Sequence, residues 1–197
     1  MPWVSSSNAG KPSVYPGRSS WVQLVCQCSL QGVPAVSMAW LGLGSNVLAE
    51  THIRAGIDAL EKDFQNVVLS PVYASTAVGF DGDDFINLVA RVETELHPME
   101  LREYLRDLED RFGRKRDVAK FSDRSLDIDI LLYDDLVLLS PVLEIPRAEI
   151  LKFPHVLKPL ADLEPDLIHP VKLRSMANIW ETSGLDDSCL RLLTAFK

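Results

Sequence analysis

The chain has 197 residues, 47% of them hydrophobic, and a formal net charge of −8 at pH 7. This length and composition predict one compact domain with a substantial core. The acidic balance argues against a broad nucleic-acid-binding surface, and no apolar run reaches the roughly 18 residues that a membrane span needs. Cys26, Cys28 and Cys189 do not form a disulfide framework, so we expect reduced thiols in a cytoplasmic protein.

Residues 1–37 differ in composition from the rest of the chain. They contain no Asp or Glu, eight Ser and only two basic residues, Lys11 and Arg18. Residues 5–17 show neither a helical nor a strand period, which is typical of disorder. A secretory signal peptide would need a cationic start ahead of a longer apolar core. We therefore expect a disordered or non-native N-terminal extension over 1–37, and a single domain over 38–197 that starts at Met38.

The first part of this domain predicts a strand, a helix and a second strand. Residues 38–44 form an apolar strand that ends in Gly44-Ser45-Asn46, which is typical of a tight turn with a helix cap. These glycines match neither common phosphate-binding glycine motif. Apolar residues at helical spacing predict a helix over 50–64. Residues 66–76 predict a strand at an edge or with a bulge, because Pro71 lacks a backbone N–H.

The next part predicts a strand, a helix and a final strand. A loop over 77–84 holds two Gly and three Asp, and apolar residues then alternate along a predicted strand over 85–96. Residues 97–113 predict a strong helix with Gly113 as its C-cap. A basic loop leads to a buried strand within 121–135, formed by the apolar residues of "LDIDILLY".

The resulting order, β-α-β-β-α-β, indicates the fold class. It is typical of an α+β, ferredoxin-like sandwich, in which both helices pack on one face of an antiparallel sheet. After residue 134 the segment "DLVLLSP" predicts an extra hairpin. Residues 145–167 predict short helices that are interrupted by prolines.

Asp127 and Asp129 are unexpected inside an apolar strand, because a buried carboxylate is costly unless its charge is compensated. Residues i and i+2 of a strand share a face, so the two Cα atoms lie roughly 6–7 Å apart. Two carboxylates at this spacing suit Mg²⁺, which prefers oxygen ligands together with substrate phosphates. The alternative is that both aspartates lie on the solvent face of an amphipathic strand.

The loop before these aspartates is strongly basic for an acidic chain. Arginine binds phosphate oxygens through paired donors. A basic loop beside a carboxylate pair therefore favours phosphoryl transfer, in which metal and arginines offset phosphate charge. A solvated surface loop is the alternative. The basic residues are Arg111, Arg114, Lys115, Arg116, Lys120 and Arg124.

Five segments in register resemble one enzyme family. The segments "LGLGSN", "SPVYASTAVG", "DFINLVARVET", "LEDRFGRKR" and "DRSLDIDILLY" are similar to those of 6-hydroxymethyl-7,8-dihydropterin pyrophosphokinases of folate biosynthesis. The resemblance covers about residues 38–170. It implies a ferredoxin-like core and an ATP-dependent diphosphotransferase that moves pyrophosphate from ATP to the pterin hydroxymethyl group and releases AMP.

The resemblance also implies roles for individual residues. Asp127 and Asp129 would bind Mg²⁺, with two ions arriving with ATP, and would act in catalysis together with Arg114 and Arg124. The remaining partners would be a dihydropterin substrate and, at most, a second copy in a weak dimer. The implied ATP-binding residues are Glu109, Arg114, Arg116, Lys120, Arg124, Ile130 and Arg147. The implied pterin-binding residues are Ser75, Val78, Gly79, Phe85, Asn87 and His155.

The chain departs from the family pattern at four places. Thr76-Ala77 replaces two prolines, Phe121-Ser122-Asp123 replaces Trp-Gly-Pro, and Pro146-Arg147-Ala148 replaces Pro-His-Tyr. His155 stands where a second aromatic ring covers the pterin. These changes leave open a divergent, non-catalytic paralogue that binds pterin or nucleotide. A nucleotidyltransferase of the polymerase-β type is a further alternative, although there the acidic pair follows the Gly-Ser turn more closely.

Overall fold

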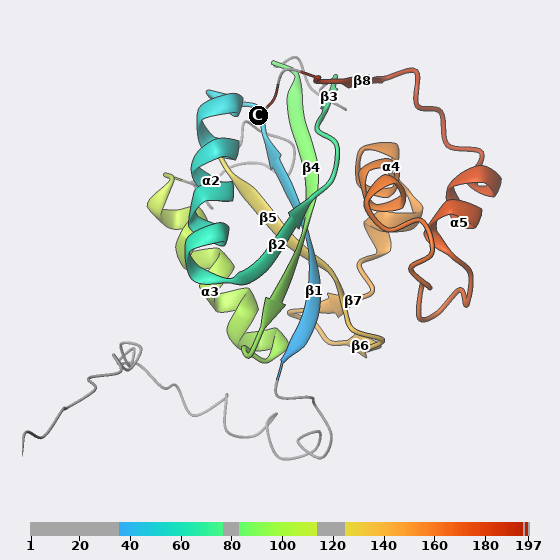
Figure 1. The fold of residues 1–197 in the computed structure, drawn as a ribbon, viewed down its shortest axis with the longest axis horizontal. Coiled ribbons are helices and arrows are strands. Elements are labelled where there is room, and N and C mark those ends of the chain that lie inside the picture. Colours follow the sequence, from blue (N-terminus) through green and yellow to red (C-terminus); the bar gives the residue numbers. More distant parts are fainter. Residues whose placement is uncertain (1–35, 77–82, 114–124, 195, 197) are drawn as a thin grey trace, which may run out of the picture. The chain divides into compact units, whose positions relative to one another are not determined.

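The computed structural model describes residues 36–76, 83–113, 125–194 and 196 (Figure 1). The predicted N-terminal extension lies outside these residues except for its last two. An antiparallel sheet forms the centre of the domain. Its strands, in spatial order, are β5 (Asp127–Tyr133), β1 (Ser37–Ser45), β4 (Phe85–Thr94), β3 (Tyr73–Ser75) and β8 (Leu190–Leu192), and β2 (Gln65–Leu69) also pairs with β4.

The chain order confirms the predicted ferredoxin-like βαββαβ core. Helix α2 (Ala49–Asp63) follows β1, and α3 (Pro98–Arg111) joins β4 to β5. The predicted strand over 66–76 is present as two strands, β2 and β3, which separate around Pro71. Ser70 connects the break to β4, since its N–H donates to the Val89 carbonyl at 2.8 Å and its hydroxyl accepts from the Val89 N–H at 2.9 Å.

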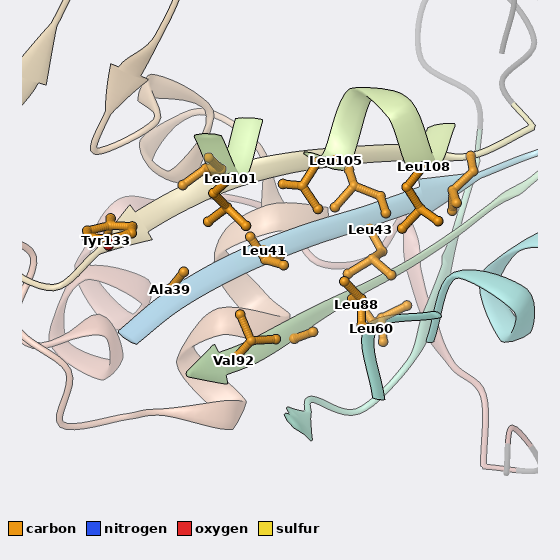
Figure 2. Close-up of a cluster of buried hydrophobic side chains, with 14 of the residues drawn as sticks. Ala39, Leu41, Leu43, Leu60, Leu88, Val92, Leu101, Leu105, Leu108 and Tyr133 are labelled. Atoms are coloured by element: carbon orange, nitrogen blue, oxygen red, sulfur yellow. The ribbon is translucent and has the colours of Figure 1, made fainter. Parts of the chain in front are cut away.

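Both helices cover the same face of the sheet, as predicted (Figure 1). The alternation along β4 places Leu88, Ala90 and Val92 on this face, where they are buried. Figure 2 shows Leu101, Leu105 and Leu108 of α3 in one cluster with side chains of β1 and β4, and α3 itself packs beside β5. The resulting core includes Ala39, Leu41, Leu43, Ile53, Leu60, Leu101, Leu105, Leu108, Ile128 and Ile130.

The opposite face carries a second, smaller core. A 3₁₀ helix, η1 (Ala148–Leu151), and helices α4 (Pro154–Leu163) and α5 (Met176–Ser183) supply its outer layer. They pack on Trp40, Val89 and Leu131 of the sheet. Farther along the same face, β1 carries Gly42 and Gly44, β5 carries Asp127 and Asp129, and β4 carries Asn87 and Phe85. The sequence predicted short helices up to residue 167 but did not predict α5 or β8.

The predicted hairpin after residue 134 is present as β6 (Leu138–Leu139) and β7 (Glu144–Ile145), which pair with each other. Helix α3 also begins and ends as its sequence indicates. Glu100 closes a capping box with His97, and Gly113 follows the C-cap with a φ of 79°. Among the described residues, no helix is long and apolar enough to cross a membrane.

The predicted turn at Gly44-Ser45-Asn46 is wrong. Gly44 and Ser45 belong to β1, which is paired with β4 along its whole length. Helix α2 starts only after Leu48, which has a φ of 44° and makes no side-chain capping hydrogen bond. The Ser45 hydroxyl donates instead to the carbonyl of Ser125, at 2.5 Å, and so connects the end of β1 to the start of β5.

Candidate active site

The two aspartates lie beside a strip of glycine in the central strand. Asp127 is directly opposite Gly44, and Asp129 is opposite Gly42. On the other side of β1, Gly44 is opposite Asn87 of β4. Directly opposed residues of an antiparallel sheet project to the same face. The carboxylates and the Asn87 amide therefore share one face, with Gly44 between them.

Because Gly42 and Gly44 have no side chains, this part of the sheet face leaves room above the backbone of β1. A Cβ on Gly44 would lie 3.5 Å from Oδ1 of Asn87, and a Cβ on Gly42 would lie 3.2 Å from a methyl group of Leu131. A glycine inside a central strand often marks a close approach by a ligand. The alternation of Leu and Gly in "LGLG", residues 41–44, indicates a strand with glycine on this face. The predicted turn did not take this alternation into account.

Glu109, predicted to contact the nucleotide, is a buried carboxylate at the end of α3. Its Oε1 accepts a hydrogen bond from the Ile128 N–H at 2.8 Å. Ile128 stands between the two aspartates, and β5 is the outer strand on this side of the sheet. Glu109 therefore connects α3 to the segment that presents both carboxylates, and its nucleotide contact stays a prediction.

Arg147 lies against the aspartate pair. Its Nη2 donates to Oδ2 of Asp129 at 3.1 Å, and its Nε lies 3.4 Å from Oε2 of Glu149. The backbone N–H of Arg147 donates to the Leu131 carbonyl at 2.9 Å, which fixes the residue beside β5. Arg147 was predicted as an ATP-binding residue. In this structure its guanidinium compensates the charge of Asp129.

Three of the predicted pterin-binding residues meet on β3 and β4. Ser75 is opposite Phe85, and Phe85 and Asn87 are two residues apart, so all three project to the face of the aspartates. The Asn87 amide donates to the Ser75 hydroxyl at 2.9 Å. Ser75 and Asn87 are both buried. This hydrogen bond fixes the orientation of the amide.

His155 is in the first turn of α4, which packs over β4. Its ring stacks on Phe153 with the centroids 5.2 Å apart and an angle of 19° between the planes. Burial lowers the pKa of His155 below its usual value, which favours the neutral ring at pH 7. A neutral imidazole that already stacks on one ring has the character needed to cover a flat heterocycle.

A hydrogen-bonded cluster attaches α4 to β3 near these residues. The hydroxyl of Tyr73 on β3 donates to the carboxylate of Asp162, which also accepts from Lys158 at 2.6 Å. Burial, followed by the hydrogen bond to Asp162, raises the pKa of Tyr73. Local sequence patterns do not reveal the Tyr73–Asp162 pair, because 89 positions separate the two residues.

The other predicted residues are placed as follows. Ile130 is buried in the core under α2 and α3, so its side chain points away from the aspartates and only its backbone is left for nucleotide contact. The remaining predictions fall outside the described residues. These are Val78 and Gly79 of the pterin set, and Arg114, Arg116, Lys120 and Arg124 of the phosphate set.

The donor set fits Mg²⁺ in one specific way. The Asp129 side chain is 40% exposed and shares its face with Asp127, so both can offer carboxylate oxygens to a hard cation. In the part of the chain that is described, no group of three or more His, Cys, Asp or Glu side chains could hold a metal ion. This arrangement suits a cation that completes its shell with phosphates and water, as Mg²⁺ commonly does.

Comparisons with known proteins agree with this geometry. A family model described as 7,8-dihydro-6-hydroxymethylpterin-pyrophosphokinase (HPPK) matches residues 40–165, more than half of the chain. The chain is 34% identical over 156 residues to 2-amino-4-hydroxy-6-hydroxymethyldihydropteridine pyrophosphokinase of Aquifex aeolicus, covering 78% of this chain and 97% of that protein. It is 39% identical over 140 residues to the protein of the same name from Pseudomonas aeruginosa, covering 68% and 85%.

Solved structures share the fold. Wild-type Plasmodium falciparum HPPK-DHPS with pteroate matches with a TM-score of 0.63 at 12% identity, over 80% of this chain and 48% of that chain. This chain therefore spans less than half of the solved protein that it matches. The family match and the identities above 30% decide the classification. The chain belongs to the 7,8-dihydro-6-hydroxymethylpterin-pyrophosphokinase family.

Proposed function

We propose that this protein transfers pyrophosphate from ATP to the hydroxymethyl group of 6-hydroxymethyl-7,8-dihydropterin, as a step of folate biosynthesis. The products are AMP and the pterin diphosphate. One observation carries the proposal within the structure: the aspartate pair and the Ser75–Asn87 pair lie on one face of the sheet, on either side of Gly44. The names of the relatives support the same reaction.

This geometry suits a transfer between two bound molecules. Strands β5 and β4 are separated only by β1, which corresponds to about 10 Å across the sheet. A pterin beside Asn87 and a triphosphate beside the aspartates would meet above Gly44. The hydroxymethyl oxygen would bond to the β-phosphorus, the bond from that phosphorus to the AMP oxygen would break, and the hydroxyl proton would be released. Holding both reactants in line supplies much of the rate enhancement.

Asp127 and Asp129 would hold the Mg²⁺ that accompanies ATP, with two ions as the expected number. Bound Mg²⁺ would neutralise phosphate charge and orient the reacting groups. Glu109 would keep both aspartates in place through Ile128. We assign phosphate contacts to Arg114, Arg116, Lys120 and Arg124, with Arg114 and Arg124 at the transferring group.

On the pterin side, Ser75 and Asn87 would bind the polar edge of the heterocycle. Phe85 and His155 would cover its faces, and Val78 and Gly79 would shape the pocket through backbone contacts. Aromatic and imidazole rings stack well on flat heterocycles. We further propose a cytoplasmic protein that is a monomer or a weak dimer, with residues 38–197 as its functional domain.

A product assay tests this function. The full chain is mixed with ATP, Mg²⁺ and 6-hydroxymethyl-7,8-dihydropterin, and the nucleotides are separated by chromatography. The expected result is AMP that forms only when the pterin is present. Release of pyrophosphate instead of AMP would indicate nucleotidyl transfer. Tight binding of both ligands without AMP would indicate a non-catalytic paralogue.

A further inference from the structure

Arg147 is positioned by the backbone and not only by its own ion pair. Its N–H donates to the carbonyl of Leu131, two residues beyond Asp129 on β5, and its carbonyl accepts from the Ile150 N–H at 3.2 Å. Hydrogen bonds on both sides of the residue fix where its side chain starts. The guanidinium therefore reaches Asp129 from a defined position, and the contact is not a chance encounter between two flexible surface chains.

The guanidinium has two carboxylate partners of unequal importance to the site. Its Nη2 donates to Asp129, and its Nε lies near Glu149, which belongs to η1. A rotation about the Cδ–Nε bond moves Nη2 away from Asp129 and leaves Nε in place near Glu149. The side chains of Arg147 and Asp129 are 30% and 40% exposed, so water and ligands reach both.

A cation bound to Asp129 would compete directly with Arg147. Oδ2 of Asp129 lies 3.1 Å from Nη2, and a divalent ion at that oxygen would be adjacent to a positive guanidinium. Like charges at such a distance repel each other. Arginine also binds phosphate oxygens well, because its planar donors match their geometry. A nucleotide would thus offer Arg147 a new partner at the moment when Mg²⁺ takes Asp129.

We propose that Arg147 is the counter-cation of Asp129 in the metal-free protein and exchanges this carboxylate for phosphate oxygens when the nucleotide brings Mg²⁺. This inference rests on the proposed function, since it assumes that Asp129 is a metal ligand. It adds an order of binding to that function. Mg²⁺ alone binds weakly, whereas Mg²⁺ and the nucleotide bind well together.

One substitution of Arg147 should change the affinity for metal and the affinity for nucleotide in opposite directions. In Arg147→Gln the affinity for Mn²⁺ alone should rise about fivefold, which corresponds to the loss of one partly exposed ion pair. The affinity for α,β-methylene-ATP with Mg²⁺ should fall about tenfold, because a hydrogen bond to a charged group is lost. A residue with only a structural role would weaken both or neither.

Arg91→Gln is a matched control. The Arg91 side chain is also 30% exposed and forms an ion pair, with Glu164, away from the aspartates. The full-length wild type and both variants are stripped of metal, and Mn²⁺ binding is measured by electron paramagnetic resonance. Only Arg147→Gln should gain affinity, and adding Asp129→Asn should abolish the gain. Equal Mn²⁺ affinities for wild type and Arg147→Gln, or binding by neither, would overturn the inference.

The product assay on the same wild-type sample separates this outcome from a failure of the proposed function. If AMP forms and the Mn²⁺ affinities are equal, the pyrophosphokinase stands and the exchange by Arg147 is wrong. If no AMP forms but Arg147→Gln gains Mn²⁺ affinity through Asp129, the counter-cation role stands and the reaction is wrong.

Discussion

Glu109 accepts a hydrogen bond from the N–H of Ile128 at 2.8 Å, at the centre of the Asp-Ile-Asp segment. A buried carboxylate on a helix thus satisfies a backbone donor on the outer side of β5. Without an acceptor this N–H would be left unsatisfied at low exposure. The position of the first residues of β5, and with it the direction of both aspartate side chains, therefore depends on the end of α3.

This dependence predicts different results for two substitutions of Glu109. Glu109→Ala removes the acceptor and should destabilise the fold by about 1–3 kcal/mol. Glu109→Gln keeps an oxygen at the same place and should lose less. Thermal unfolding compares the two, and ATP affinity is measured on Glu109→Gln. A Gln variant as unstable as the Ala variant would show that the negative charge, rather than the acceptor, is required.

Substitution of Asp129 should separate activity from stability. Asp129→Ala removes a predicted metal ligand, and turnover should fall by more than roughly 100-fold, since even outer-shell partners of a metal cost roughly 10–100-fold. The free energy of unfolding without metal should change by less than about 1 kcal/mol, because the lost ion pair with Arg147 is partly exposed. A large loss of thermal stability in the metal-free variant would assign Asp129 a structural role instead.

The two glycines of β1 should respond differently to alanine. In Gly44→Ala the new methyl group meets Asn87 at an ordinary contact distance, so the fold should be retained. That methyl group stands between the aspartates and Asn87, and kcat/KM should fall. In Gly42→Ala the methyl group crowds the buried Leu131, which should cost about 1–3 kcal/mol of stability. Melting temperatures and kinetics on both variants check this, and an unimpaired Gly44→Ala enzyme would contradict the proposed position of the phosphates.

His155 should make stability depend on pH. Burial lowers its pKa in the folded state, so the unfolded chain binds a proton more readily. Its contribution is therefore fully present above the unfolded pKa of about 6.5 and is lost as the pH falls below that value. His155→Phe should lose less melting temperature than the wild type between about pH 7 and pH 5.

The His155 comparison contains its own control. Burial also lowers the pKa of His169, which is present in both proteins, so its contribution cancels in the difference. Parallel profiles of melting temperature against pH for wild type and His155→Phe would show that folding does not change the pKa of His155. Pterin affinity measured on the same variant tests whether a phenyl ring replaces the imidazole.

Local sequence patterns predicted the parts of the fold that depend on local periodicity. The alternation in β4 identified the buried positions from Leu88 to Val92, and Pro71 indicated the interruption between β2 and β3. The same reasoning failed for Gly44, because a glycine that follows an apolar run resembles a turn. Only the pairing of β1 with strands on both sides shows that Gly44 is inside a sheet.

Contacts between distant segments were not predictable in the same way. The ion pair of Arg147 with Asp129 depends on the hairpin β6–β7, which returns the chain to β5. Helix α5 is short, and its stability comes from burying Met176 and Ile179 against other elements. The aspartate pair was recognisable because its polarity contradicts its surroundings.

The strand β8 has a consequence for where this protein can be cut. It pairs with β3, and the Leu193 N–H continues the contact to the Val72 carbonyl at 2.9 Å. Both β8 and α5 follow residue 165, where the family match ends. A chain truncated there would uncover the apolar side of α4 and expose the outer backbone groups of β3, a template for aggregation. The shortest fragment that stays folded and does not aggregate should therefore extend past residue 165 to the end of β8.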